Sequence, residues 1–378
     1  MTLTFVLAAF AVLSLALLLW QCVVAARFPL HRRAPEPERH RPVSLLKPLK
    51  DCDAETESCL RSWLTQDYAG TVEVLFGVAD SSDPVCALVT RLIGEHPRCD
   101  ARLILCSKQL GPNAKVSSLV HLAREAKHEL LGISDADVWA PEDFLANALA
   151  SFRDPNLGLV NAFYRFANPL NVAMRWEAFA INADFWSQVL QSASLKPMDF
   201  ALGAAMFTTR RHLDGIGGFG SIVDYLADDY ELGHRIHANG GRIELSPIVV
   251  ECRERRMSFG EVWAHQLRWA RTIRVCQPLP YFFSILSNPT LWPLLWALLA
   301  LSPVSLTGAA VCLATRMACG AWLERRLTRR WHWDSCLMAP VKDLLQLPIW
   351  ALAFTGRHVL WRGERLRVTD GGRLRPAA

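Results

Sequence analysis

The sequence lacks several patterns that would indicate common classes of function. Its eleven cysteines form no CxxC pair, which argues against a zinc site or a disulfide framework and favours buried free thiols in a reducing compartment. The middle of the chain has neither a basic stripe interleaved with aromatic residues nor a recognition motif, so nucleic acid is not an expected partner. The stretch GIGGFG lacks the spacing and the lysine of a phosphate loop and predicts a turn.

Long apolar runs are what the sequence does contain. Apolar residues make up 51% of the 378 positions and charged residues 20%, a mixture that indicates membrane segments combined with a polar domain. The run from Leu3 to Ala25 has no charge and exceeds the roughly 20 residues that cross a hydrocarbon core. Arginines follow this run and none precedes it, so we interpret residues 1–26 as an uncleaved transmembrane anchor rather than a signal peptide. The positive-inside rule then places the next domain in the cytoplasm.

Three apolar stretches follow near the C-terminus. Residues 281–302 and 303–322 are separated by a Ser-Pro breaker, and each could span a membrane or take part in a helical hairpin. The second carries Arg316 toward its end, where the side chain could snorkel to the interface. The third stretch, 336–356, contains Lys342-Asp343, so a full crossing and a re-entrant or interfacial helix both stay open. The basic residues beside these runs indicate contact with anionic lipid headgroups.

The polar middle of the chain alternates short β-rich runs with helical patterns. VSLLKPL, VEVLFGVAD, ARLILC, HELLGIS and LGLVNAF predict strands, and the segments near 55–65, 84–95, 114–127 and 142–152 predict helices. This alternation predicts an α/β fold with a doubly wound, mostly parallel sheet, in which ligands bind outside the carboxyl ends of the strands. The resulting domains are an anchor (1–26), an α/β domain (42–277), membrane and interfacial helices (278–358) and a basic tail (359–378).

Acidic residues fall at the expected ligand-binding edge. Asp80 ends the second predicted strand, and Asp135 and Asp137 follow the fourth, just before a helix that we expect to begin at Pro141. Two carboxylates on such a loop suit a hard cation, Mg²⁺ or Mn²⁺, that substrate phosphates also coordinate. The alternative is an Asx-type turn with helix capping and no metal.

Two later patterns also have two interpretations. Asp228-Asp229 opens a helical pattern, where acidic side chains could simply compensate the helix dipole. Arg268-Trp269 lies in the segment HQLRWARTIR, which could be a basic interfacial helix or could clamp a phosphate through arginine and position a substrate through tryptophan. Taken alone, Asp228-Asp229 is better explained by dipole compensation, and Arg268-Trp269 keeps both interpretations.

The order of these motifs resembles that of membrane-bound inverting glycosyltransferases of the GT-A fold. The segments SLLKPLKDCDAE, VLFGVADSSDPV, LGPNAKVSSLVHLAREAKHELLGISDADV and LADDYELGHRI resemble the ceramide glucosyltransferases of glycosyltransferase family 21, to which bacterial hopanoid-associated glycosyltransferases are similar. The resemblance covers residues 42–277. It implies a UDP-sugar donor, a divalent cation (Mg²⁺ or Mn²⁺) and a membrane-lipid acceptor such as ceramide or a hopanoid.

The resemblance also assigns roles to single residues. It implies that Asp80 contacts the nucleotide, Asp135 the ribose or the metal, Asp137 the metal that bridges the diphosphate, and that Asp229 is the catalytic base. Arg268 and Trp269 match the last two positions of the family's (Q/R)xxRW motif, whereas His265 stands where Gln or Arg is expected, so the role of that position stays open. Lys47 and Lys115 lie beside strand-end loops and are further candidates for phosphate contacts.

The sequence therefore predicts a multi-pass enzyme, with a cytoplasmic catalytic domain in a bacterial inner membrane, that moves glucose from UDP-glucose to a ceramide-like lipid. One alternative is transfer of N-acetylglucosamine to a hopanoid. A processive polysaccharide synthase would share the acidic motifs but usually needs more membrane helices. A non-catalytic membrane protein or transporter would be expected to carry several charges near the bilayer midplane, and only Arg316 and Lys342-Asp343 qualify.

Overall fold

The computed structural model describes residues 2–35, 40–361, 364–369 and 371–376. The chain forms two units, and each is assembled from separate stretches of sequence. The sheet unit comprises Leu30–Asn168, Pro197–Arg255 and Arg365–Ala378, and the helical unit comprises Met1–Pro29, Pro169–Lys196 and Arg256–Glu364. Two stretches of the continuous domain expected from the sequence, 169–196 and 256–277, thus belong to the helical unit.

The strands of the sheet unit form one eight-stranded sheet. They are β1 (Val43–Leu49), β2 (Val72–Val78), β3 (Asp100–Leu105), β4 (Leu130–Ser134), β5 (Val138–Trp139), β6 (Leu157–Phe166), β7 (Ala205–Thr209) and β8 (Arg242–Cys252). Their order is β3-β2-β1-β4-β7-β6-β8-β5. The first four strands in this order are mutually parallel, and β6 is parallel to β8. β7 is antiparallel to both of its neighbours, and β5 is antiparallel to β8.

Helices cover this sheet. They are α2 (Thr56–Leu64), α3 (Val85–Glu95), α4 (Ala114–Glu125), α5 (Phe144–Leu149), α8 (Arg210–Gly215) and α9 (Asp228–Ala238), with the 3₁₀ turn η2 (Phe219–Ile222). Every residue of β1, β4 and β7 is buried, which explains why these strands do not alternate between polar and apolar residues. The core includes the ring of Phe144, which packs against Trp63 on one side and Phe207 on the other.

The structure confirms the predicted fold class and the five predicted strands of the sheet. It corrects one boundary, because α5 begins at Phe144 and not at Pro141. Residues 141–143 form a turn instead, and the amide of Phe144 donates to the carbonyl of Pro141. The turn predicted for GIGGFG is also confirmed, since Gly217 and Gly218 have positive φ and their amides bond back to the end of α8.

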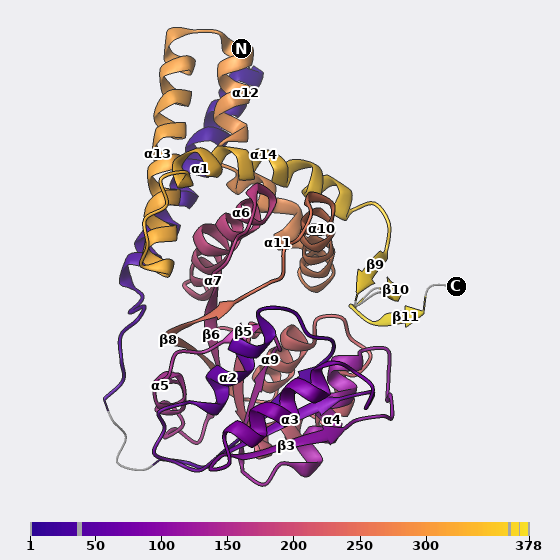
Figure 1. Ribbon diagram of the computed structural model, residues 1–378. Helices are drawn as coiled ribbons and strands as arrows, with labels where there is room; N and C mark the ends of the chain where they lie inside the picture. Colours follow the sequence, from indigo (N-terminus) through magenta and orange to yellow (C-terminus); the bar gives the residue numbers. More distant parts are fainter. Residues whose placement is uncertain (1, 36–39, 362–363, 370, 377–378) are drawn as a thin grey trace. The chain divides into compact units, whose positions relative to one another are not determined.

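The helical unit contains the apolar segments. Its elements are α1 (Thr2–Arg27), α6 (Val172–Phe179), the π-helix η1 (Ala180–Phe185), α7 (Trp186–Ala193), α10 (Phe259–Cys276), α11 (Pro278–Phe283), the 3₁₀ turn η3 (Ser284–Ser287), α12 (Leu291–Ala300), α13 (Pro303–Thr328), α14 (Ser335–Ala353) and β9 (His358–Trp361). Within this unit α1 packs beside α12 and α13 (Figure 1). Beyond β9, the C-terminal hairpin consists of β10 (Glu364–Val368) and β11 (Leu374–Pro376) and is part of the sheet unit except for Glu364.

Among the described residues, α1, α13 and α14 are long and apolar enough to cross a membrane. The stretch 281–302, expected as one apolar segment, is broken: α11 with η3 and the following α12 form a pair bent by 51°. The predicted Ser-Pro breaker is confirmed, because Ser302 caps α13 and Pro303 is its first residue. In Figure 1 α14 runs across α13 rather than alongside it, as an interfacial helix would.

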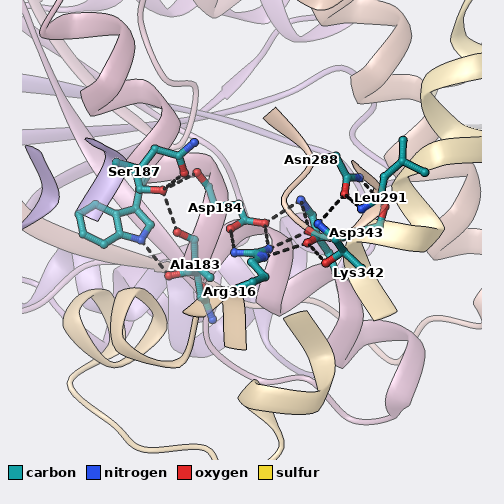
Figure 2. A network of polar contacts seen from close by, with 12 residues as sticks. Ala183, Asp184, Ser187, Asn288, Leu291, Arg316, Lys342 and Asp343 are labelled. Atoms are coloured by element: carbon teal, nitrogen blue, oxygen red, sulfur yellow. Dashed lines mark hydrogen bonds and ion pairs between the residues drawn. The ribbon is translucent and has the colours of Figure 1, made fainter. Parts of the chain in front are cut away.

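The charges of the apolar segments meet in one buried cluster, shown in Figure 2. The guanidinium of Arg316 on α13 donates two hydrogen bonds to Asp184 on η1, at 2.9 and 2.8 Å, and two to Asp343 on α14, at 2.9 and 2.8 Å. Lys342 lies 2.6 Å from Asp184, and Thr290 donates to Asp343. Arg316 is only 1% exposed, so the expectation that it snorkels to the interface is wrong.

Candidate functional site

The site is built where β1 and β4 lie side by side in the sheet. The strand order turns at this pair: β2 and β3 follow on the side of β1, and the later strands on the side of β4. Ligands of such sheets bind at the carboxyl ends of the strands near the turning point. Asp135 and Asp137 follow the last residue of β4 at this edge.

Lys47 stabilises that edge from inside the sheet. Its side chain is fully buried on β1, and its Nζ donates to the carbonyl oxygen of Asp135 at 2.6 Å and to Oγ of Ser134 at 3.2 Å. Burial lowers the pKa of Lys47 to about 8. The visible contacts of Lys47 therefore order the loop that carries the acidic residues, while its predicted contact with the donor phosphate stays a prediction.

The two carboxylates of the loop differ in their partners. Asp135 lies 2.7 Å from Nζ of Lys115, whereas Asp137 makes no ion pair with any described residue. Burial, followed by the charge of Asp135, raises the pKa of Asp137 to about 6. Asp137 has no cationic partner of its own among the described residues and lies beside the carboxylate of Asp135. Asp135 and Asp137 together therefore fit a hard divalent cation.

The loop supplies two carboxylates as possible ligands of a divalent cation. No group of three or more His, Cys, Asp or Glu in the described part of the chain is arranged to hold an ion. Mg²⁺ is commonly bound through one or two carboxylates together with substrate phosphates. Two carboxylates, Asp135 and Asp137, would leave coordination positions for the phosphate oxygens of a nucleotide.

Lys115 joins the acidic loop to the later acidic pair. It lies in the first turn of α4, almost fully buried, with Nζ 2.7 Å from Asp135 and 3.1 Å from Asp228. Although burial opposes its charge, these two carboxylates raise the pKa of Lys115 above its usual range. Lys115 was predicted as a phosphate ligand; the structure places it between two carboxylates, and the phosphate contact stays a prediction.

Asp228 and Asp229 are the first residues of α9, as the sequence pattern predicts. Asp228 is buried and is held by Lys115, while Oδ1 of Asp229 accepts from the amide of Tyr230 at 2.8 Å. Burial raises the pKa of Asp229 to about 6, and the neighbouring charge of Asp228 acts in the same direction. Burial is the larger of the two causes.

This shift gives a testable pH dependence. If Asp229 accepts a proton in the reaction, the rate should fall as the pH drops through about 6, because the protonated carboxyl can no longer accept one. An unperturbed aspartate, with a pKa of about 3.9, would leave the rate unchanged in that range. The measurement is kcat/KM for the lipid acceptor between about pH 5 and pH 8 with saturating donor and metal, because this ratio reports the pKa of the enzyme before the acceptor binds. A flat profile down to about pH 5 would contradict the shift.

Asp80 lies at the same edge but outside the cluster. It follows β2, which is the neighbour of β1, and its side chain is exposed. Its carboxylate accepts from the amide of Ser82 at 2.9 Å, and this hydrogen bond lowers its pKa. The position is accessible to a ligand, and the predicted contact of Asp80 with a nucleotide stays a prediction.

Arg268 and Trp269 lie on α10 of the helical unit. One turn earlier, Nδ1 of His265 lies 2.7 Å from the buried carboxylate of Glu177, and its ring packs edge-on against Trp269. Gln266 is buried and donates to the same Glu177 oxygen at 2.9 Å. The unusual residue of the motif thus has a defined place against Glu177 and Trp269, while the roles of Arg268 and Trp269 stay predictions.

Asn113 is a site residue that the sequence analysis missed. Its Oδ1 caps α4 by accepting from the amide of Val116, and its Nδ2 donates to the carbonyl of Tyr225 and lies 3.5 Å from Asp228. Its position in the sequence could have identified it as a helix cap, because asparagine is a preferred N-cap residue directly before a helical pattern. Asn113 links the helix of Lys115 to the segment that precedes Asp228.

Comparison with known structures identifies the class of fold. A mannosyltransferase from Pyrobaculum calidifontis, solved in complex with GDP-Man and Mn²⁺, superposes with a TM-score of 0.57 at 22% sequence identity, over 93% of this chain and 99% of that one. The protein has the GT-A glycosyltransferase fold. The family model for glycosyl transferase family 21 matches residues 4–374, and the chain belongs to this family.

Curated relatives match shorter parts of the chain. The ceramide glucosyltransferase of Candida albicans is 31% identical over 135 residues, which are 32% of this chain and 25% of that protein. The beta-monoglucosyldiacylglycerol synthase of Synechocystis is 24% identical over 235 residues, which are 60% of this chain and 47% of that protein. The matches thus span about a quarter to a half of the length of these relatives.

Proposed function

We propose that this protein transfers glucose from UDP-glucose to the hydroxyl of a membrane lipid, with inversion at the anomeric carbon. The observation that carries the proposal is the cluster in which Lys115 joins the Asp135–Asp137 loop to the Asp228–Asp229 pair at the carboxyl edge of β4. It brings two carboxylates, of which Asp137 has no ion pair with any described residue, close to a separate carboxylate with a raised pKa. Membership of family 21 and the glucosyltransferase names of the relatives support the sugar and the lipid acceptor.

The donor would be held mainly by its diphosphate. Asp137 and Asp135 would hold Mg²⁺ or Mn²⁺, which supplies neutralisation of the negative charge that develops as the diphosphate departs. Asp80 would contact the nucleotide from the end of β2. The guanidinium of Arg268 would add positive charge, and Trp269 would position the reacting groups. The complex of the Pyrobaculum neighbour with GDP-Man and Mn²⁺ supports a metal-bound nucleotide sugar on this fold.

Asp229 would act as the base. In a single displacement the lipid hydroxyl attacks the anomeric carbon from the face opposite to UDP, and one carboxylate takes the proton from that hydroxyl. A raised pKa makes Asp229 a better proton acceptor than an ordinary aspartate, while the carboxylate stays ionised at neutral pH. Asp228 is held by Lys115 and is therefore less suited to accept the proton.

The acceptor is proposed to be a lipid because the catalytic sheet is part of a chain with several membrane-length helices. We propose that the sheet unit lies in the cytoplasm, because basic residues follow α1. The similarity to a bacterial relative supports a bacterial inner membrane as the location. The direction of α14 in Figure 1 supports an interfacial helix, whose apolar surface would lie in the headgroup region. Ceramide is the proposed acceptor; N-acetylglucosamine transfer to a hopanoid is the alternative, and a processive synthase is less well supported.

The deciding experiment incubates membranes that carry the protein with each radiolabelled UDP-sugar, UDP-glucose and UDP-N-acetylglucosamine, and with ceramide, diacylglycerol or a hopanoid polyol. A labelled lipid formed from UDP-glucose and ceramide is the expected product. Membranes that carry Asp137→Ala are the matched control for endogenous enzymes. Absence of any labelled lipid above this control would contradict the proposed function.

Replacement of Asp137 by Ala is expected to abolish both transfer and its stimulation by metal, because this carboxylate has no other cation to compensate. The measurement is the initial rate of lipid glucosylation as a function of Mn²⁺ concentration. Asp83→Ala, which removes a carboxylate of the β2–α3 loop that accepts from the amides of Val85 and Asp51, is the control. Near-normal, metal-stimulated activity in Asp137→Ala would refute the metal assignment.

The product is expected to be the β-glucoside, since UDP-glucose is α-linked and a single displacement inverts the anomeric centre. The coupling constant of the anomeric proton in the purified lipid distinguishes the two anomers. An α-linked product would require a second displacement and a carboxylate nucleophile, and would contradict the role proposed for Asp229.

A further inference from the structure

The C-terminal hairpin of the sheet unit pairs with the segment that leads into the acidic pair. The amide of Leu226 donates to the carbonyl of Gly372 at 3.1 Å, and the amide of Leu374 donates to the carbonyl of Asp224 at 2.6 Å. Between these two bonds, Tyr225 and Arg373 form an antiparallel β-bridge. Asp228 begins α9 only two residues after Leu226. The tail therefore contacts the backbone that sets the starting point of α9.

Side chains reinforce the backbone pairing. Nε of Arg373 donates to the hydroxyl of Tyr225 at 3.1 Å, and its guanidinium lies 5.4 Å from the centre of the tyrosine ring. The guanidinium of Arg235 on α9 lies 5.0 Å from the same ring centre. Tyr225 thus contacts one arginine from the tail and one from the helix that carries Asp229. Cation–π contacts of this kind each add a modest stabilisation.

The turn of the hairpin has the backbone geometry that this contact requires. Gly371 and Gly372 have φ values of +80° and +81°, which residues with a side chain rarely adopt. The amide of Gly372 donates to the carbonyl of Thr369, and the amide of Thr369 donates to the carbonyl of Arg373. These bonds close the turn and leave the carbonyl of Gly372 available to Leu226.

The contact continues from Tyr225 into the site. The carbonyl of Tyr225 accepts from Nδ2 of Asn113 at 2.8 Å, and the amide of Asn113 donates to the carbonyl of Val223 at 3.0 Å. Asn113 caps the helix whose first turn carries Lys115, and Lys115 pairs with Asp228. A continuous chain of hydrogen bonds and ion pairs therefore joins Arg373 to the acidic pair.

We propose that the C-terminal hairpin positions the catalytic base: residues 372–374 fix the segment 224–226, and this segment fixes Asp229 at the start of α9. Arg373 is a positioning residue, and it does not touch the reacting groups. The inference rests on the proposed function of Asp229 as the base. Among the described residues no hydrogen bond or ion pair joins the hairpin directly to the loop of Asp135 and Asp137, and the two are linked only through Asn113 and Lys115. We therefore expect the tail to affect turnover more than UDP binding.

The experiment compares the full chain with a variant that lacks residues 371–378. Displacement of a catalytic group by about 1 Å can cost roughly 10²-fold in rate, so a fall of kcat by about 10²-fold is expected on truncation. UDP affinity in the presence of Mn²⁺, measured by calorimetry, should stay within about twofold, because a tenfold change would require a lost interaction of about 1.4 kcal/mol. This measurement also reports whether the truncated protein is folded.

Point variants separate positioning from general destabilisation. Arg373→Ala removes the hydrogen bond to Tyr225 and the cation–π contact, and should lower kcat by roughly three- to tenfold. Tyr225→Phe removes the hydrogen bond and keeps the ring, so it should lower kcat by roughly threefold. Their effects should not add in the double variant. Arg375→Ala removes the same charge from the same hairpin, at a side chain with no contact to Tyr225, and should leave kcat unchanged. Addition of a synthetic peptide of residues 364–378 should restore part of the activity of the truncated enzyme.

The possible outcomes distinguish failure of the proposed function from failure of the positioning role of the hairpin. If the full chain transfers no sugar from any UDP-sugar to lipid, the proposed function fails. If the full chain is active and the truncated enzyme is equally active or more active, the positioning role of the hairpin is refuted and the proposed function stands. A truncation that lowers kcat and UDP affinity together, with additive effects of Arg373→Ala and Tyr225→Phe, would also refute the positioning role.

Discussion

Asp229→Asn is expected to lower the rate of lipid glucosylation by about 10²- to 10⁴-fold, the range in which general-base terms usually fall. The amide keeps the shape of the carboxylate and can still accept from the amide of Tyr230, so the start of α9 should stay in place. The amide cannot take a proton from the acceptor hydroxyl. Turnover should therefore collapse while UDP affinity is nearly unchanged, which initial rates and calorimetry measure.

Asp228→Asn is the matched control for this prediction. Asp228 lies 3.1 Å from Lys115, and the variant loses that ion pair but keeps the Asp229 carboxylate. We expect a smaller loss of rate, through a weaker hold on the start of α9. An inactive Asp228→Asn enzyme beside an active Asp229→Asn enzyme would show that the other carboxylate is the base.

Arg316→Met is expected to be the most destabilising single substitution in the helical unit. It removes the cation that two carboxylates share and leaves Asp184 and Asp343 with only Lys342. Removal of one partner from a buried ion pair typically costs about 3–5 kcal/mol, because an uncompensated charge stays buried. The expected result is a large fall in Tm of the detergent-solubilised protein, or loss of monodisperse protein during purification.

Two further variants test whether charge is the cause. Arg316→Met combined with Asp343→Asn leaves one positive and one negative side chain in the cluster, and should recover part of the lost stability. Arg325→Met changes an exposed arginine of the same helix that lies 4.6 Å from the ring centre of Trp331, and should cost at most about 1 kcal/mol. Equal Tm values for Arg316→Met and Arg325→Met would show that the cluster does not stabilise the unit.

Local patterns in the sequence predicted most of the strands and helices of the sheet unit. β1 and β2 were predicted within two residues of their bounds, because a buried strand between turn residues depends mainly on its own composition. The start of α5 was predicted wrongly, because it does not depend on local sequence alone. Pro141 suits the first position of a helix, but the chain forms a turn there and the helix begins at Phe144, whose ring fits between Trp63 and Phe207. Tertiary packing decided that boundary.

The acidic residues of the site were also visible in the sequence, since they directly follow a strand or begin a helix. Their partners were not visible. Lys115 and Asp228 are distant along the chain, and only the packing of α4 and α9 around the sheet brings Nζ of Lys115 to both Asp135 and Asp228. Lys47 was predicted as a phosphate ligand from its place near a strand end, and that contact stays a prediction. Its contact with the backbone of Asp135, which the pairing of β1 with β4 makes possible, was not visible in the sequence.

By itself, the sequence determined the apolar segments, the alternation of strands and helices, and the acidic loop at the sheet edge. These features depend on interactions between residues that are near neighbours along the chain. Only the tertiary structure decided that Arg316, Lys342 and Asp343 share one buried cluster with Asp184, and that the C-terminal hairpin holds Tyr225. Arg316 has no acidic partner in its own apolar run, and the low dielectric of the interior requires one. The fold supplies that partner from a distant part of the chain.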